Sequence, residues 1–358
     1  LRRKVPAARS SLFLITDAEG KPATEYKGKK LKGEEKPWVG TEVLLPASWK
    51  ERDLFLEVDG LAGEEPVLVL GERRLKLSPD LPYKFPVAWS DQPLRLRIKA
   101  DAIQQDVWLR SYPRAASVRF ASVMPSWQDK ELRVLAQGTR APGQPRLVRV
   151  QVAATADFAR VDKESAWFPL EPGEGDFRTR FAMPWPDAKP WTPDTPNLYF
   201  FRVELKHAEN RLADRTLPVR FGFREIRIAA GRFWLNDVPL DLHGNNHTPF
   251  SSSKHASVLG VLENLEYLLR KWKDEQHCNA FIAWAGDMVD RSLLYDVADE
   301  VGLLGVQILR GPQADFADNE HVQRYNRRVT EGEVRRYAHH PSLLAWEASG
   351  GGPYTWMC

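Results

Sequence analysis

The chain has 358 residues, 43% of them hydrophobic and 28% charged, which is the balance of a globular protein with two or three domains. Its 51 basic and 48 acidic residues leave a net charge of only +3, so the sequence does not predict a nucleic-acid-binding protein. No apolar run approaches the roughly 18 residues that a membrane-spanning helix requires, and we expect no membrane partner.

Residues 1–37 form a basic lead-in with little to pack. No aromatic platform is interleaved with its lysines and arginines, which favours a flexible, solvated segment over a nucleic-acid patch. The segment lacks a continuous apolar stretch, so we predict no signal peptide, and no compartment is indicated. The chain begins at Leu1 rather than at a methionine, which suggests a fragment or a processed product.

The sequence shows no cluster of metal-ligating residues. Cys278 and Cys358 are too few for a disulfide framework and match no zinc-binding spacing. His339 and His340 stand in tandem before a proline, which favours a helix end over a ligand set. We therefore predict no metal site and no cofactor.

Residues 38–112 alternate apolar and polar side chains in short runs, with turn signals such as Asp59-Gly60 between them. This pattern is typical of an antiparallel sandwich. The chain also has 13 tryptophans, most of which fit sandwich cores. Carbohydrate-handling proteins use the same flat rings against the C–H surfaces of sugars.

Residues 113–224 form a second all-β stretch, whose strand density predicts an immunoglobulin-like sandwich. The proline-rich residues 183–196 cannot be a central strand, because proline donates no ladder hydrogen bond, so we expect an extended surface connection. The expected strands are residues 117–123, 131–136, 146–154, 177–181, 199–205 and 215–220.

After Phe233 the pattern changes to short apolar strands that alternate with amphipathic helices. Such alternation predicts parallel strands covered by helices, with Gly302 ending the second helix. Four strand–helix units amount to half of a (β/α)8 TIM barrel. The expected strands are residues 240–242, 279–283, 303–308 and 343–346, and the expected helices are residues 258–272, 291–301 and 321–337.

Polar and aromatic side chains follow the ends of these strands, where barrel enzymes build their active sites. Asn246 and His247 have the groups to orient sugar hydroxyls, although a loop histidine is equally often structural. Trp284 could stack on a sugar ring and Asp287 could bind hydroxyls, but a core tryptophan and a helix N-cap explain them at least as well. Trp346, at the end of the fourth strand, completes the predicted substrate-binding set.

Several blocks of this sequence resemble glycoside hydrolase family 2, which includes β-galactosidases, β-glucuronidases and β-mannosidases. Residues 38–60, with Pro46-Ala-Ser-Trp49, resemble the entry to the family's sugar-binding jelly roll. Residues 191–199, Trp-Thr-Pro-Asp-Thr-Pro-Asn-Leu-Tyr, resemble its immunoglobulin-like domain, and residues 221–247 resemble the crossing into its catalytic barrel. Residues 295–304 and 340–346 resemble the second helix and the fourth strand of that barrel.

The resemblance implies retaining hydrolysis by two glutamates about 5 Å apart. The family's acid/base glutamate follows the fourth strand, at a position that falls on Gly350, Gly351 or Gly352 here, and the strand of the nucleophile would lie beyond Cys358. Glu347 stands three or four residues earlier, which is roughly 10–13 Å along a strand that rises about 3.3 Å per residue, so it cannot replace the acid. No catalytic residue is therefore predicted.

The expected fold is a multidomain β plus α/β protein with four parts. They are a lead-in at 1–37, a shortened jelly-roll galactose-binding-like domain at 38–112, an immunoglobulin-like sandwich at 113–224 and the amino-terminal half of a TIM barrel at 225–358. The implied function is hydrolysis of terminal β-glycosidic bonds, by a chain that is inactive or incomplete as given, with carbohydrate as its partner. The alternatives are a non-catalytic carbohydrate-binding protein and a decayed product whose open sheet edges favour aggregation. The sequence indicates neither the sugar nor the oligomeric state.

Overall fold

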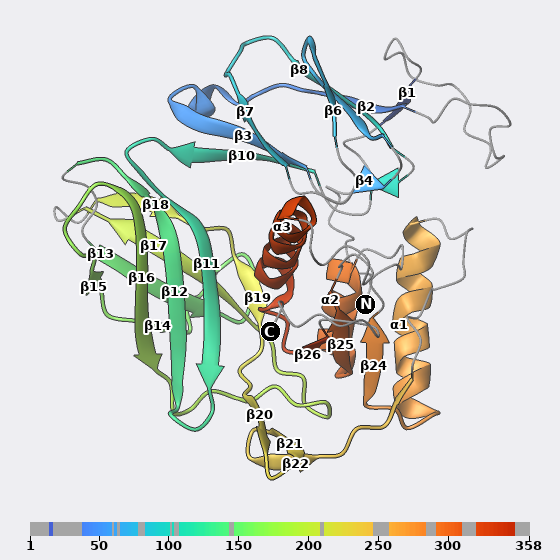
Figure 1. Cartoon of the computed structure of the whole chain (residues 1–358). Coiled ribbons are helices and arrows are strands. Elements are labelled where there is room, and N and C mark those ends of the chain that lie inside the picture. Colours follow the sequence, from blue (N-terminus) through green and yellow to red (C-terminus); the bar gives the residue numbers. More distant parts are fainter. Residues whose placement is uncertain are drawn as a thin grey trace, which may run out of the picture. The chain divides into compact units, whose positions relative to one another are not determined.

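The structure is a computed structural model that describes residues 14–16, 38–58, 61–62, 65–77, 83–100, 102–103, 107–142, 147–207, 211–245, 258–283, 291–309 and 320–347. The chain divides into two compact units, Leu1–Tyr112 and Pro113–Cys358, and each is described by itself. Strands dominate both, so the protein has a β-rich multidomain fold (Figure 1). None of the helices in the described ranges has both the length and the apolar character needed to cross a membrane.

The first unit is built from antiparallel strands, as the alternating pattern predicts. One sheet has the order β1-β2-β8-β5-β6, a second has the order β10-β3-β7, and β4 pairs with β9. Alternation in β3 buries Leu54, Leu56 and Val58, which join Leu68 and Ile98 in the core or at its margin. The elements are β1 (Leu14–Thr16), β2 (Trp38–Val43), a 3₁₀ turn (Ala47–Trp49), β3 (Arg52–Val58), β4 (Leu61–Ala62), β5 (Val67–Leu70), β6 (Arg73–Lys76), β7 (Tyr83–Val87), β8 (Leu94–Lys99), β9 (Ala102–Ile103) and β10 (Trp108–Pro113).

The second unit begins with two antiparallel sheets that share one core. The order of the first is β11-β12-β16, and that of the second is β14-β13-β17-β18, with β15 on β13 and β19 on β17. Fully buried Val148 and Val150 of one sheet pack with Leu132 and Val134 of the other. The strands are β11 (Ala116–Ser126), β12 (Glu131–Arg140), β13 (Leu147–Ala153), β14 (Lys163–Glu164), β15 (Phe168–Pro169), β16 (Gly175–Pro184), β17 (Tyr199–Lys206), β18 (Leu212–Arg215) and β19 (Val219–Phe221).

One expected strand in these sheets is wrong, and one expected connection differs in part. Residues 215–220 do not form one strand, because Pro218 interrupts the ladder, so β18 ends at Arg215 and β19 begins at Val219. The proline-rich residues after Pro184 form the expected connection, and most of its side chains are exposed or half-buried, but two of its tryptophans are buried. Trp185 is 5% exposed and Trp191 is 0% exposed, because their rings fill two different hydrophobic clusters.

A parallel sheet with the order β23-β24-β25-β26 follows, after a small antiparallel sheet with the order β20-β21-β22. Helices α1, α2 and α3 alternate with the parallel strands and lie beside them, which confirms the predicted alternation (Figure 1). The elements are β20 (Ile226–Ala229), β21 (Arg232–Leu235), β22 (Val238–Leu240), β23 (Gly244–Asn245), α1 (Val258–Asp274), β24 (Ala280–Ala283), α2 (Arg291–Val301), β25 (Leu304–Ile308), α3 (Glu320–Tyr337) and β26 (Leu343–Glu347).

The first parallel strand is not residues 240–242, as expected, but β23. Asn236 and Asp237 have φ angles of 49° and 66°, which is the left-handed geometry of a tight hairpin turn. This turn folds β22 back along β21, so Leu240 pairs with Phe233 instead of opening the parallel sheet.

The parallel sheet is apolar on both faces. On one face Phe281 and Leu343 pack with Leu269 of α1 and Tyr295 of α2. On the other face Ala280, Leu304 and Leu344 pack with Trp191 and Leu235, which precede the sheet in the chain. A sheet buried on both faces is the arrangement expected of parallel strands.

Gly302 ends α2 in a position that only glycine fits. Its φ is +79°, and a Cβ would lie 2.0 Å from the carbonyl oxygen of Pro193. We expect Gly302→Ala to lower the free energy of unfolding by about 3 kcal/mol, because it adds a clash with backbone to left-handed strain.

Gly231→Ala is the matched control, because its φ is +72° and nothing lies within 4 Å of the added Cβ. It should cost about 1 kcal/mol, from backbone strain alone. Urea unfolding of the two variants measures the difference, and equal losses would show that the contact with Pro193 is unimportant.

Candidate functional site

Most of the predicted site residues lie outside the described residues. These are Asn246, His247, Trp284 and Asp287, together with the glycines at 350–352. Trp346 is described: its ring is half-buried and packs beside Tyr337 of α3, with ring centroids 6.5 Å apart. Core packing accounts for this contact, and a role in sugar binding stays a prediction.

The buried side-chain amide of Gln307 supports the described strand ends of the parallel sheet. Parallel pairing brings the carboxyl ends of β24, β25 and β26 to one edge, where Ile308 pairs with Glu347. Gln307, which is 0% exposed, lies within hydrogen-bond distance of the Tyr295 hydroxyl at 3.2 Å and donates to the Ile308 carbonyl oxygen at 2.7 Å. These bonds fix the end of β25 against α2.

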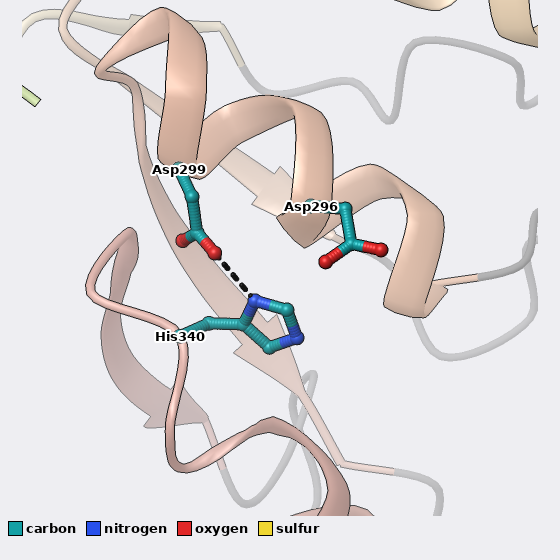
Figure 2. Close-up of side chains that lie close together, drawn as sticks. All are labelled: Asp296, Asp299 and His340. Carbon is teal, nitrogen blue, oxygen red and sulfur yellow. Dashed lines mark hydrogen bonds and ion pairs between the residues drawn. The ribbon is translucent and has the colours of Figure 1, made fainter. Parts of the chain in front are cut away.

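A buried ionic cluster lies where α2 meets the turn between α3 and β26 (Figure 2). Asp299 of α2 is 0% exposed and lies 2.7 Å from His340 Nδ1. Its other carboxylate oxygen accepts bonds from the Ser342 backbone N–H at 3.0 Å and from the Ser342 hydroxyl at 2.6 Å. Burial by itself raises the pKa of Asp299, but His340, Arg220 and Ser342 together hold it below its usual value.

Arg220 of β19 supplies the cation of this cluster. Its guanidinium contacts the carboxylates of Asp299 at 3.2 Å, Asp296 at 2.8 Å and Glu300 at 2.6 Å. Three carboxylates of α2 are thus tied to one arginine of β19.

A second arginine fixes the turn itself. Arg224 donates to the carbonyl oxygens of Pro341 at 3.0 Å and of Leu343, and burial lowers its pKa to about 10. The guanidinium therefore stays charged at neutral pH while it satisfies backbone carbonyls. Arg220 thus ties β19 to α2, and Arg224 ties the segment between β19 and β20 to the start of β26.

The cluster has the residue types of a metal site but also its own cation. One ligand atom each from Asp296, Asp299 and His340 lies within 4.8 Å of the others. The Arg220 guanidinium contacts both carboxylates, which neutralises the charge that a divalent ion would neutralise. We therefore interpret the cluster as an ion-pair network that positions α2 and the turn. His340 lies just after a helix end, as its sequence predicts, but its contact with Asp299 is not predictable from its own surroundings. The i, i+3 spacing of Asp296 and Asp299 is the one signal of a shared partner.

A pocket of about 250 Å³ opens beside the cluster. Its walls come from the end of β11, from residues 221–226 and from the turn after α3, and its polar lining includes Glu225, Arg133 and His339. The ring of His339 lies 4.2 Å from that of His340. Burial and this neighbouring ring lower the pKa of His339 well below its ordinary value, so the imidazole lining the pocket is neutral at pH 7.

These two shifts predict destabilisation in acid. His339 has a lowered pKa in the folded state, so its contribution is present above about pH 6.5 and is lost as the pH falls below that value. The Asp299 contribution is present above about pH 3.9 and is lost only as the pH falls through its lowered folded-state pKa.

We therefore expect the free energy of unfolding, measured in urea, to fall between pH 7 and pH 5, and His339→Gln to remove that fall. His243→Gln, which changes an exposed histidine, should leave the pH dependence intact. If His339→Gln changes the pH dependence of the unfolding free energy no more than His243→Gln does, His339 does not cause the loss of stability in acid.

The sequence of this chain is similar to those of known glycosidases. Residues 121–224 match the sequence model of the glycosyl hydrolases family 2. A β-galactosidase of Thermoanaerobacterium thermosulfurigenes is 29% identical over 161 residues, which cover 45% of this chain and 21% of that protein. A β-mannosidase of Capra hircus is 26% identical over 117 residues, which cover 33% and 13%. Residues 121–224 thus match glycoside hydrolase family 2, and the chain is similar to glycosidases of the kinds named above.

Solved structures of glycosidases share the fold. A β-glucuronidase of Bacteroides uniformis matches with a TM-score of 0.62 at 19% identity, over 87% of this chain and 40% of that chain. A β-D-mannosidase of Dictyoglomus thermophilum matches with a TM-score of 0.67 at 15% identity, over 87% and 45%. The chain thus spans less than half the length of these two structures, and about a fifth of the β-galactosidase.

Proposed function

We propose that this family 2 chain carries the sugar-recognition part of a glycosidase that acts on terminal β-glycosides. In this proposal residues 38–112 are a jelly-roll domain, residues 113–224 an immunoglobulin-like sandwich and residues 225–358 half of a TIM barrel, preceded by a lead-in at 1–37. The observation that carries the proposal is the parallel sheet β23-β24-β25-β26, whose carboxyl ends meet at one edge in the order that such barrels use.

The sugar would lie against that edge. Asn246 and His247 follow β23, Trp284 and Asp287 follow β24, and Trp346 belongs to β26. Amide, imidazole and carboxylate groups can fix hydroxyl directions, and an indole can cover an apolar sugar face. A terminal residue of a β-glycoside is the substrate class that the family membership favours.

Hydrolysis by a retaining mechanism needs two carboxyl groups about 5 Å apart. The position of the acid falls on Gly350, Gly351 or Gly352, which offer no proton. Glu347 belongs to β26 itself, several residues before that position. We therefore propose that residues 1–358 by themselves bind a β-glycoside without cleaving it, which is also the property of a non-catalytic carbohydrate-binding protein.

Hydrolysis of nitrophenyl β-galactoside, β-mannoside and β-glucuronide tests the loss of chemistry. We expect no nitrophenolate above the buffer rate, and the same result for Glu347→Gln. Turnover that disappears in Glu347→Gln would identify Glu347 as an acid and overturn the argument from the glycines. Turnover that survives this substitution would place the acid elsewhere in the chain.

A further inference from the structure

The outward face of the sheet β14-β13-β17-β18 carries an unusual set of side chains. Alternation turns Val148, Val150 and Val152 into the core, where each is 0% exposed. The register pairs Arg149 with Glu204. The opposite face therefore gathers charged and aromatic groups, which we call the cationic face: Arg149, Gln151, Glu164, Trp167, Arg202, Glu204, Lys206 and Arg215.

Of the eight described residues that define the cationic face, four are basic and two are carboxylates. Glu204 is 1% exposed and serves as an anchor, because it accepts from Arg149 at 2.9 Å and from Arg215 at 2.6 Å. Glu164 accepts from Arg149 at 2.8 Å and from Gln151 at 2.8 Å. Both carboxylates are thus committed to holding side chains of the face in place.

Arg202 carries charge that neither carboxylate binds directly. Its guanidinium donates to the uncharged amide of Gln151 at 2.9 Å and lies 4.1 Å from the centre of the Phe158 ring. Burial, and then the like charge of Arg215, lower the pKa of Arg202. The arginines of this face repel one another, and a bound anion would lower that repulsion.

Trp167 supplies a flat surface over the same residues. Its ring centre lies 4.4 Å from the Arg149 guanidinium and 4.3 Å from Lys206 Nζ. Both cations project from neighbouring positions of the sheet, since Arg149 pairs with Glu204 and Lys206 pairs with Leu147. The indole is half-buried beside these two cations, so part of its surface is accessible.

We propose that the cationic face binds an acidic saccharide. One pyranose ring stacks on Trp167, and a carboxylate or sulfate group of the sugar meets the guanidinium groups of Arg202 and Arg215. The aromatic platform favours a sugar over an acidic peptide, and the excess positive charge favours an acidic sugar over a neutral one. The face belongs to a different sheet from the strand ends, so it is a second saccharide site, independent of the proposed substrate site.

Titration calorimetry with tetragalacturonate and with neutral cellotetraose tests the proposal on the full chain. We expect saturable binding of tetragalacturonate that weakens as salt rises, because exposed charges are screened within about 10 Å at 0.1 M. Cellotetraose should not bind at the cationic face. Trp167→Ala and Arg202→Gln should each weaken tetragalacturonate binding at least about fivefold.

Arg180→Gln is the matched control, because it removes one exposed arginine from β16 in the opposite sheet. It should leave the affinity unchanged, and the thermal transition of every variant shows that the fold is kept. No binding of tetragalacturonate, or equal losses in Arg180→Gln and Arg202→Gln, would overturn the proposal. A third outcome would also overturn it: polyglutamate competes with tetragalacturonate, and Trp167→Ala leaves the tetragalacturonate affinity unchanged. That result would indicate a general surface for acidic polymers.

Discussion

Asp299→Ala should cost about 3–5 kcal/mol of unfolding free energy, the range measured when one partner of a buried ion pair is removed. The carboxylate is 0% exposed and accepts from Arg220, His340 and Ser342. Its removal leaves the buried His340 imidazole and the Ser342 hydroxyl without their acceptor, and takes one of three carboxylates from Arg220. Equilibrium unfolding in urea, at constant slope, measures the loss.

Asp296→Ala is the matched control for this prediction. Asp296 also contacts Arg220, at 2.8 Å, but its side chain is 40% exposed. Water can replace it, so the expected loss is within about 1 kcal/mol. Similar losses in the two variants would mean that burial of Asp299 does not set the strength of the cluster.

Trp191→Ala should be comparably damaging, at about 3–5 kcal/mol for a large ring removed from a core. The ring is 0% exposed and packs with Leu235 and Leu304. Its Nε1 donates to the Asp299 carbonyl oxygen at 2.8 Å, so the same side chain fills the core and binds a carbonyl group in the last turn of α2. Thermal and urea unfolding of the variant report the loss.

Two further variants separate these roles of Trp191. Trp191→Phe keeps most of the volume and removes the donor, so about 1–3 kcal/mol is expected from the unsatisfied carbonyl. Trp108→Ala removes a ring that is 41% exposed and should change stability little. If Trp191→Phe is as stable as the parent, the hydrogen bond from Trp191 does not contribute to stability.

The local periodicity of the sequence predicts the helices and strands of the second unit well. Residues 291–301 have helical spacing and end at Gly302, and α2 has those bounds. The errors come from chain reversals: Asn236 and Asp237 turn the chain one strand earlier than expected, and Pro218 divides a single expected strand. A period-two pattern shows that a strand exists but not which neighbour it pairs with.

The sites were less predictable because they depend on contacts between distant segments. Arg220 and Asp299 are separated by 79 residues, and nothing in the spacing of either indicates the other. Arg149, Trp167 and Lys206 likewise meet only through strand pairing. The strand-end residues that sequence reasoning did select, Asn246 and Asp287 among them, lie outside the described residues and stay predictions.

We expect these 358 residues to bind a β-glycoside at the strand ends without cleaving it. Titration calorimetry with non-hydrolysable thio-β-galactoside, thio-β-mannoside and thio-β-glucuronide tests it most directly. The prediction is saturable heat with at least one of them, equal in the parent chain and in Trp167→Ala, in which the cationic face has lost its platform. No heat with any of the three from a folded chain, or heat that disappears in Trp167→Ala, would contradict it.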